Sequence, residues 1–482
     1  ALSAPGQANA AAGGGSGARP GGSLGAPVPR PPDDSFASGA RVLSIGIAST
    51  GIFTFAYLAS SSHLLDASSY SRIALCWAVM FVILSVIYRP IEQLLSRTIA
   101  DRRARGLHSH PLRVPAGIQL GFAAVFLIAA LALHDQIQQG MFDGSASLYW
   151  ILVIGVLAYA GSYFARGWLA GHKRFALYGG LVFLESTSRF LFPLAVAVGI
   201  GSGQDAIGLG MAVAPFASLS VMPFALSRIR RAGPPAGPGV PAADAAAEGP
   251  VHAQLEEVSA DLTLRHGAGF AVAVVGIMFS EQMLMNAGVL IVAAKAGGGT
   301  LTTGVVGFVF NVMLIVRAPL QLFQAIQTSI LPHLTSLEVQ ESPAEFHRAV
   351  RITVLVIGGF ALAVAVGLLA IGPEVMTAVL GDKGYDYGRL GLAIVGVGMG
   401  LHLISGTLNQ AALARDQATP ASIAWLSSVA LFSAWVATAS EHGGALVTRV
   451  EVGYCGAAAF LTLLLWGLYR HGPRRSSAAT AT

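Results

Sequence analysis

Two side chains of opposite charge stand four residues apart inside an apolar stretch of membrane-spanning length. The stretch is LVFLESTSRFLFPLAVAVG, residues 181–199, and the charged residues are Glu185 and Arg189. At this spacing on a helix, both side chains lie on one face and can form an ion pair. Ionisable residues within a membrane face a cavity or a partner, because exposure to lipid is costly. The pair therefore predicts a polar path through the membrane.

Two later apolar stretches carry polar side chains in the same way. Arg317 and Gln321 share one helical face, and so do Gln282 and Asn286, because residues four apart lie one above the other. A guanidinium binds phosphate oxygens through two parallel hydrogen bonds and keeps its charge when partly buried. These residues therefore indicate a site for an anionic substrate.

We assign an expected role to each of these residues. Arg189 and Arg317 would bind the anion, and Glu185 would hold and neutralise Arg189 when no anion is present. The complete expected substrate-binding set is Arg189, Arg317, Glu185, Gln321, Gln282 and Asn286. Glu281 would couple transport to H⁺ or Na⁺, because the protonation of a carboxylate in a cavity depends on its surroundings. The structural alternative is that these residues only tie helices together by hydrogen bonds and one ion pair.

The composition shows which class of chain surrounds these charges. Of 482 residues, 54% are hydrophobic and only 11% are charged, with a mean hydropathy of +0.65. Soluble domains carry about 25% charged residues, so the chain is expected to be a polytopic membrane protein. Its net charge of +5 does not imply nucleic-acid binding, since membrane proteins concentrate Arg and Lys in cytoplasmic loops. Cys76 and Cys455 fall inside apolar runs, so we expect no disulfide, no metal site and no cofactor.

Twelve apolar runs are long enough to cross a membrane as helices, each needing about 20 residues. We therefore predict an all-α polytopic membrane protein with twelve transmembrane helices in two six-helix bundles. The runs are residues 42–62, 73–90, 116–134, 148–169, 177–200, 206–226, 269–293, 304–330, 352–371, 390–411, 421–439 and 453–469.

The expected domains follow from the Pro- and Gly-rich stretches and from the distribution of positive charge. Residues 1–38 and 472–482 would be cytoplasmic tails, the first of them disordered, and residues 232–262 a flexible cytoplasmic linker. The bundles would comprise residues 39–231 and 263–471. Most of the 29 Lys and Arg residues fall on the inner side when the amino terminus is cytoplasmic. Both termini are therefore predicted to be cytoplasmic.

Three segments resemble bacterial polysaccharide flippases of the multidrug/oligosaccharidyl-lipid/polysaccharide exporter superfamily. YFARGWLAGHKRFALYGG (163–180) resembles the loop after their fourth helix, and GVVGFVFNVMLIVRAPLQLFQAIQTSILPHLT (304–335) their eighth helix. RVLSIGIASTGIFTFAYLASSSHLLDASSYSRIAL (41–75) resembles their first helix and outer loop, with DASS (66–69) in place of the usual Gly-bearing turn.

The resemblance implies a central cavity between the two bundles and transport by alternating access. It also implies a substrate, an oligosaccharide on a polyprenyl diphosphate, moved from the inner to the outer leaflet for cell-surface polysaccharide assembly. The protein would act in the bacterial cytoplasmic membrane as a monomer, with membrane lipid as its surroundings and H⁺ or Na⁺ as a coupling ion.

Three other classes of membrane protein are alternatives to a polysaccharide flippase. A drug exporter of the same superfamily would share the architecture. A major facilitator transporter would also have two six-helix halves, and ADRRARG (100–106) is similar to one of its loops. However, Arg97 and Ala104 occupy positions where that loop has glycines. A membrane enzyme is not expected, because no nucleophile–base constellation or phosphate-binding glycine loop is visible.

Overall fold

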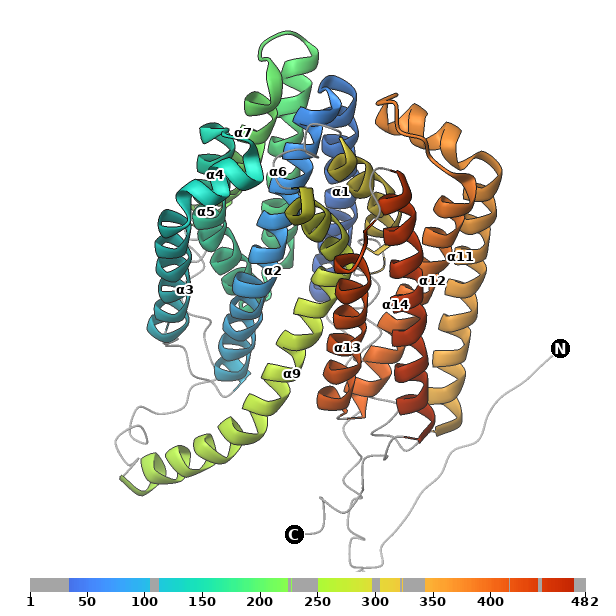
Figure 1. The fold of residues 1–482 in the computed structure, drawn as a ribbon. Helices are drawn as coiled ribbons and strands as arrows, with labels where there is room; N and C mark the ends of the chain where they lie inside the picture. Colours follow the sequence, from blue (N-terminus) through green and yellow to red (C-terminus); the bar gives the residue numbers. More distant parts are fainter. Residues whose placement is uncertain are drawn as a thin grey trace, which may run out of the picture.

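The computed structural model describes residues 34–104, 112–223, 227, 250–296, 304–320, 323, 343–415, 417–440 and 444–471. Within these ranges the regular secondary structure is entirely helical. Long helices run side by side as two groups, one coloured blue to green and the other yellow-green to red (Figure 1).

The first bundle begins with α1 (Asp34–Leu64), α2 (Ala67–Ala104) and α3 (Arg113–Ala132). A short helix, α4 (His134–Phe142), leads into α5 (Ala146–Gly171), which is followed by α6 (Phe175–Ala197) and α7 (Gly203–Leu219). The long members are apolar over most of their length. Because a helix also satisfies its own backbone hydrogen bonds, each of them can cross lipid.

The second bundle begins with α9 (Pro250–Ala296) and the helix Val305–Leu320, which has no label in Figure 1. It continues with α11 (Pro343–Leu380), α12 (Arg389–Ala414), α13 (Ala418–Ala437) and α14 (Gly444–His471). α11 bends at Ile371, where the backbone leaves the helical conformation two residues before Pro373. Proline removes a backbone donor and clashes with the preceding turn, which accounts for the bend.

The predicted fold class is confirmed. Ten helices in the described residues are long and apolar enough to span a membrane. The other two predicted runs coincide with α1 and with the helix Val305–Leu320. α3 and α11 expose most of their apolar surface, as expected for helices whose outer faces contact lipid.

Most helices extend beyond the predicted apolar runs, and three differences bear on the expected domains. α1 begins at Asp34, inside the stretch expected as a tail, and α4 was not anticipated. α9 begins at Pro250, so it occupies the second half of the expected linker, where Ala, Leu and Glu favour helix. Residues 232–249 lie outside the described ranges. The domain boundaries therefore remain predictions.

Close helix packing in the first bundle places the functional side chains. A Cβ atom added to Gly46 of α1 would lie 2.8 Å from Cα of Gly179 in α6. One added to Gly167 of α5 would lie 2.7 Å from the carbonyl oxygen of Glu92 in α2. Small residues at such crossings let two backbones approach closely. As a result, α2, α5 and α6 can direct side chains into one shared space.

Candidate substrate cavity

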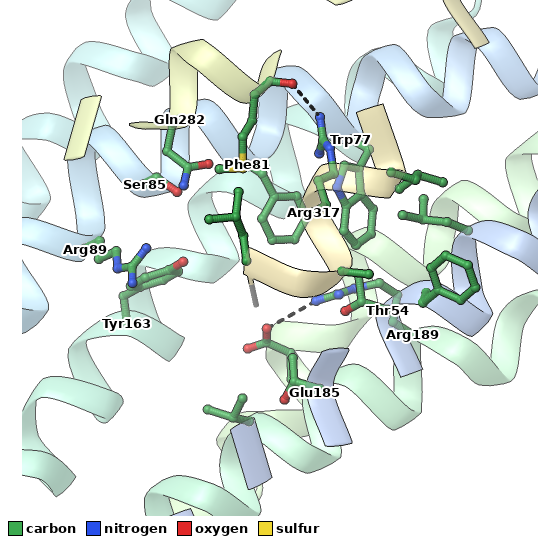
Figure 2. Close-up of a pocket in the computed structure, with 18 of the residues that line it drawn as sticks. Thr54, Trp77, Phe81, Ser85, Arg89, Tyr163, Glu185, Arg189, Gln282 and Arg317 are labelled. Atoms are coloured by element: carbon green, nitrogen blue, oxygen red, sulfur yellow. Dashed lines mark hydrogen bonds and ion pairs between the residues drawn. The ribbon is translucent and has the colours of Figure 1, made fainter. Parts of the chain in front are cut away.

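A cavity lies where the two bundles meet. It contains about 1020 Å³ of empty space, including space open to solvent. Figure 2 shows the lining side chains converging from both bundles. The lining residues are Thr50, Thr54, Phe55, Leu58, Trp77, Phe81, Ser85, Arg89, Tyr163, Arg166, Val182, Glu185, Arg189, Gln282, Met285, Leu314, Arg317, Ala318 and Leu320. The charged members are four arginines and one glutamate.

The predicted pair of Glu185 and Arg189 is present, and it is part of a larger cluster. An Nη2 of Arg189 donates to Oε1 of Glu185 at 3.2 Å. The other carboxylate oxygen accepts from Nη2 of Arg166 at 2.5 Å and from Oγ of Ser162 at 2.9 Å. Glu185 therefore compensates two arginines, and the cluster keeps one excess positive charge.

Arg166 and Arg89 also line the cavity, although neither was among the predicted site residues. Arg166 lies five residues before the end of α5, and its side chain is buried against α6. The buried carboxylate of Glu185 explains its direction, since a paired charge is tolerated inside a protein where an isolated one is not.

Aromatic rings fix the guanidinium of Arg189. Its Cζ lies 5.0 Å from the ring centre of Trp77 and 5.4 Å from that of Phe81. These two rings stack on each other with centres 4.2 Å apart. The hydroxyl of Tyr159 accepts a hydrogen bond from Arg189 at 2.5 Å. A guanidinium held by rings on one side can still bind an oxyanion along its edge.

Arg317 brings the second bundle to the cavity. Its Nη2 donates to Oδ1 of Asn286 at 2.6 Å and to the carbonyl oxygen of Met285 at 3.3 Å. Its Cζ lies 4.6 Å from the ring centre of Phe310. Asn286 is 1% exposed and does not line the cavity. Asn286 therefore contacts Arg317 and not the cavity, and its role in substrate binding stays a prediction.

Three arginines of the cavity retain hydrogen-bonding capacity. The Nε atoms of Arg166, Arg189 and Arg317 are buried and have no partner among the described residues. Buried polar atoms in proteins are nearly always hydrogen-bonded, so each N–H is a candidate donor to an oxygen of a bound molecule.

Of the six residues expected to bind substrate, Glu185, Arg189, Arg317 and Gln282 line one cavity. Gln321 lies outside the described residues. Glu281, expected to couple an ion, is partly exposed on α9 and is not part of the lining. The polar stripe Tyr159, Ser162 and Arg166 on α5 was not among the predicted site residues. Its spacing of three and four residues in an apolar helix was the available signal.

Comparison with known proteins identifies the fold. The sequence matches no protein-family model and no curated protein. It is similar in structure to a multidrug resistance MATE family transporter of the MOP superfamily in an inward-facing conformation. The TM-score is 0.61 at 13% identity, with 89% of this chain and 97% of the other covered. The fold is that of the MATE transporters.

Further solved structures agree. An outward-facing multidrug resistance MATE family transporter matches with a TM-score of 0.55 at 14% identity, covering 90% of this chain and 96% of the other. A Vibrio cholerae MATE transporter, VcmN, matches with a TM-score of 0.53 at 15% identity, covering 90% and 97%. The similarity shows the fold that the sequence resemblance implied, and it does not support a polysaccharide flippase in particular.

Proposed function

We propose that this protein is a membrane transporter that carries an anionic organic molecule through the central cavity by alternating access. The observation that carries the proposal is the cavity itself, which both bundles form and in which four arginines face one glutamate. An excess of one charge sign inside a low-dielectric cleft concentrates ligands of the opposite sign. Because the site lies between two bundles, rocking of one against the other would expose it to each side in turn.

The fold supports the transport cycle. The similar structures include transporters described as inward-facing and as outward-facing. Each matches about nine-tenths of this chain. A chain with this architecture is thus compatible with both states, and the higher TM-score belongs to the inward-facing one.

The first candidate substrate is a small anionic molecule with an apolar part, moved outward. The similar structures are described as multidrug resistance transporters. Trp77 and Phe81 supply an apolar wall beside Arg189. The fold gives no support to the major facilitator alternative.

The second candidate substrate is the lipid-linked oligosaccharide that the sequence resemblance implied. One observation favours it: Arg189 of the first bundle and Arg317 of the second line the same cavity. Two guanidinium groups from opposite sides could hold a diphosphate. We also propose that the protein lies in the bacterial cytoplasmic membrane with both termini in the cytoplasm. It would act as a monomer and couple transport to H⁺ or Na⁺.

Purified protein in lipid vesicles tests the function. Anionic and cationic dyes of similar size and apolarity would be compared for protein-dependent flux, in the parent and in Arg317→Gln. We expect flux of the anionic dye only, reduced at least tenfold in the variant. Equal flux of both dyes, unchanged in Arg317→Gln, would reject the anionic cavity as the transport site. Trapping of lipid-linked oligosaccharide on the inner leaflet of deletion cells would favour the second candidate.

A further inference from the structure

The two bundles meet at the end that carries the α1–α2 and α11–α12 connections, here called the distal face. Oγ of Ser62 donates to the carbonyl oxygen of Leu380 at 2.5 Å. A ring nitrogen of His63 lies 3.0 Å from the carbonyl oxygen of Val379. Both contacts join the end of α1 to the end of α11. They bring the outermost turns of the two bundles into direct contact.

A buried asparagine joins the bundles one layer deeper. Asn311, in the helix Val305–Leu320, is fully buried. Its Oδ1 accepts from the hydroxyl of Tyr70 at 2.5 Å, and its Nδ2 donates to the hydroxyl of Tyr387 at 3.0 Å. Tyr70 belongs to α2, whereas Asn311 and Tyr387 belong to the second bundle. One amide therefore bridges both bundles.

The backbone of Gly307 is in close contact with side chains beside this bridge. Oγ of Ser71 accepts from the backbone N–H of Gly307 at 3.0 Å. A Cβ atom added at Gly307 would lie 2.8 Å from that oxygen and 2.8 Å from the hydroxyl of Tyr385. The distal contact is thus tight enough to exclude a larger residue at this position.

The order of residues along the helices shows which side of the cavity is closed. In α1 the lining residues end at Leu58, before Ser62. In α2 Tyr70 precedes the first lining residue, Trp77, and in the helix Val305–Leu320 Asn311 precedes Leu314. All three helices place their bridging contacts between the cavity and the distal face. The structure is therefore closed distally, and with the orientation predicted from positive charge this corresponds to an inward-facing state.

One aromatic side chain links the closed face to the cavity. The ring of Phe310 lies under the guanidinium of Arg317, 4.6 Å from its Cζ. The same ring meets that of Tyr70 edge-on, with centres 6.5 Å apart. Phe310 is fully buried, so neither contact can shift freely. A continuous line of contacts runs from Arg317 through Phe310 and Tyr70 to Asn311.

We propose that Asn311 latches the distal face closed and that Phe310 couples this latch to Arg317, so that an anion bound at Arg317 loosens it. The coupling rests on the proposed function of the cavity. An anion that pairs with the guanidinium weakens its attraction to the ring. Phe310 then no longer fixes the ring of Tyr70, and the hydroxyl of Tyr70 can exchange Asn311 for water. Such coupling requires a packed element with two discrete arrangements. Here the element is the side chain of Tyr70, either held by Phe310 and Asn311 or released from both.

The latch is tested by access to the cavity from the distal face. Ser85→Cys, in a background of Cys76→Ala and Cys455→Ala, would be labelled in sealed vesicles by a membrane-impermeant maleimide applied to each face separately. We expect Asn311→Leu and Tyr70→Phe to raise the distal labelling rate at least tenfold. The matched control is Asn409→Leu, which also removes a buried amide of the second bundle, bonded there to Trp425. Melting temperatures verify that each variant is folded.

Two results would overturn the latch. The first is distal labelling of Asn311→Leu and Tyr70→Phe at the parental rate. The second is distal labelling of Asn409→Leu as fast as that of these two variants. Labelling needs no transported substrate. A failed dye-flux assay would therefore refute the proposed function and leave the latch standing.

The coupling is tested with pyrophosphate as the probe, added from the face opposite the maleimide. We expect pyrophosphate to raise distal labelling severalfold in the Ser85→Cys protein. The response should vanish in Arg317→Gln and Phe310→Leu and persist in Phe310→Tyr, which keeps the ring. An unresponsive parent, or a full response in Phe310→Leu, would overturn the coupling through this ring.

Discussion

Arg166 donates a 2.5 Å hydrogen bond to the same carboxylate, Glu185, that pairs with Arg189 one turn further along α6. The contact crosses from α5 to α6 and makes Glu185 the shared counter-charge of two buried arginines. Its loss should therefore matter more than the loss of either arginine.

Glu185→Gln is expected to destabilise the protein more than Arg189→Met. The first change leaves two buried guanidinium groups without a counter-charge, and leaving even one costs about 3–5 kcal/mol. The second leaves Glu185 paired with Arg166 and keeps an unbranched apolar side chain at the position. Thermal unfolding in the same lipid or detergent would rank the variants. An equal or greater loss in Arg189→Met would contradict the shared role of Glu185.

Arg317→Lys should preserve folding and lose most of the transport of an anionic substrate. Lysine keeps the charge, but it is a compact donor that does not reproduce the planar arrangement of a guanidinium. It would also not keep the geometry over Phe310. Initial flux rates and melting temperatures of parent and variant would be compared. A parental flux rate would show that charge alone suffices at this position.

Asn286→Asp should weaken anion binding more than Asn286→Ala. The carboxylate would stand where Oδ1 now accepts from Arg317 at 2.6 Å, and it would neutralise the guanidinium. We expect at least tenfold weaker binding of an anionic dye, or about 1.4 kcal/mol. Binding titrations on detergent-solubilised protein would measure it. Equal affinities for the two variants would argue against a positioning role on Arg317.

Glu281→Gln tests the predicted coupling ion. The amide cannot change its charge, so substrate binding should persist while the dependence of flux on an imposed H⁺ or Na⁺ gradient is lost. Vesicles with a gradient of one ion at a time distinguish the two ions. A variant that responds to both gradients as the parent does would exclude Glu281 as the coupling residue.

Membrane orientation can be tested with two single cysteines in a background lacking Cys76 and Cys455. Positive charge predicts that Val240→Cys faces the cytoplasm and that Gly140→Cys, in α4, faces outward. An impermeant maleimide applied to intact cells should label the second and spare the first. The opposite pattern would reverse the orientation of the whole chain and identify the distal face as cytoplasmic.

The sequence was sufficient to predict the membrane class and the long apolar helices, but not the short helix α4. An apolar run of about 20 residues has only one stable way to cross lipid, which is as a helix that satisfies its own hydrogen bonds. The pairing of Glu185 with Arg189 was equally accessible, since it depends on spacing along one helix. For the same reason the polar stripe Tyr159, Ser162 and Arg166 on α5 could have been recognised from the sequence. Its contact with Glu185 on α6 could not.

Only the tertiary structure decided which helices share a partner. Arg166 reaches Glu185, Asn286 holds Arg317 and Asn311 bridges Tyr70 and Tyr387, and each contact joins different segments of the chain. Spacing along one helix fixes which residues share a face, but not which neighbour that face meets. The neighbour depends on the rotation and crossing of packed helices, which are set where glycines such as Gly46 and Gly167 let backbones approach.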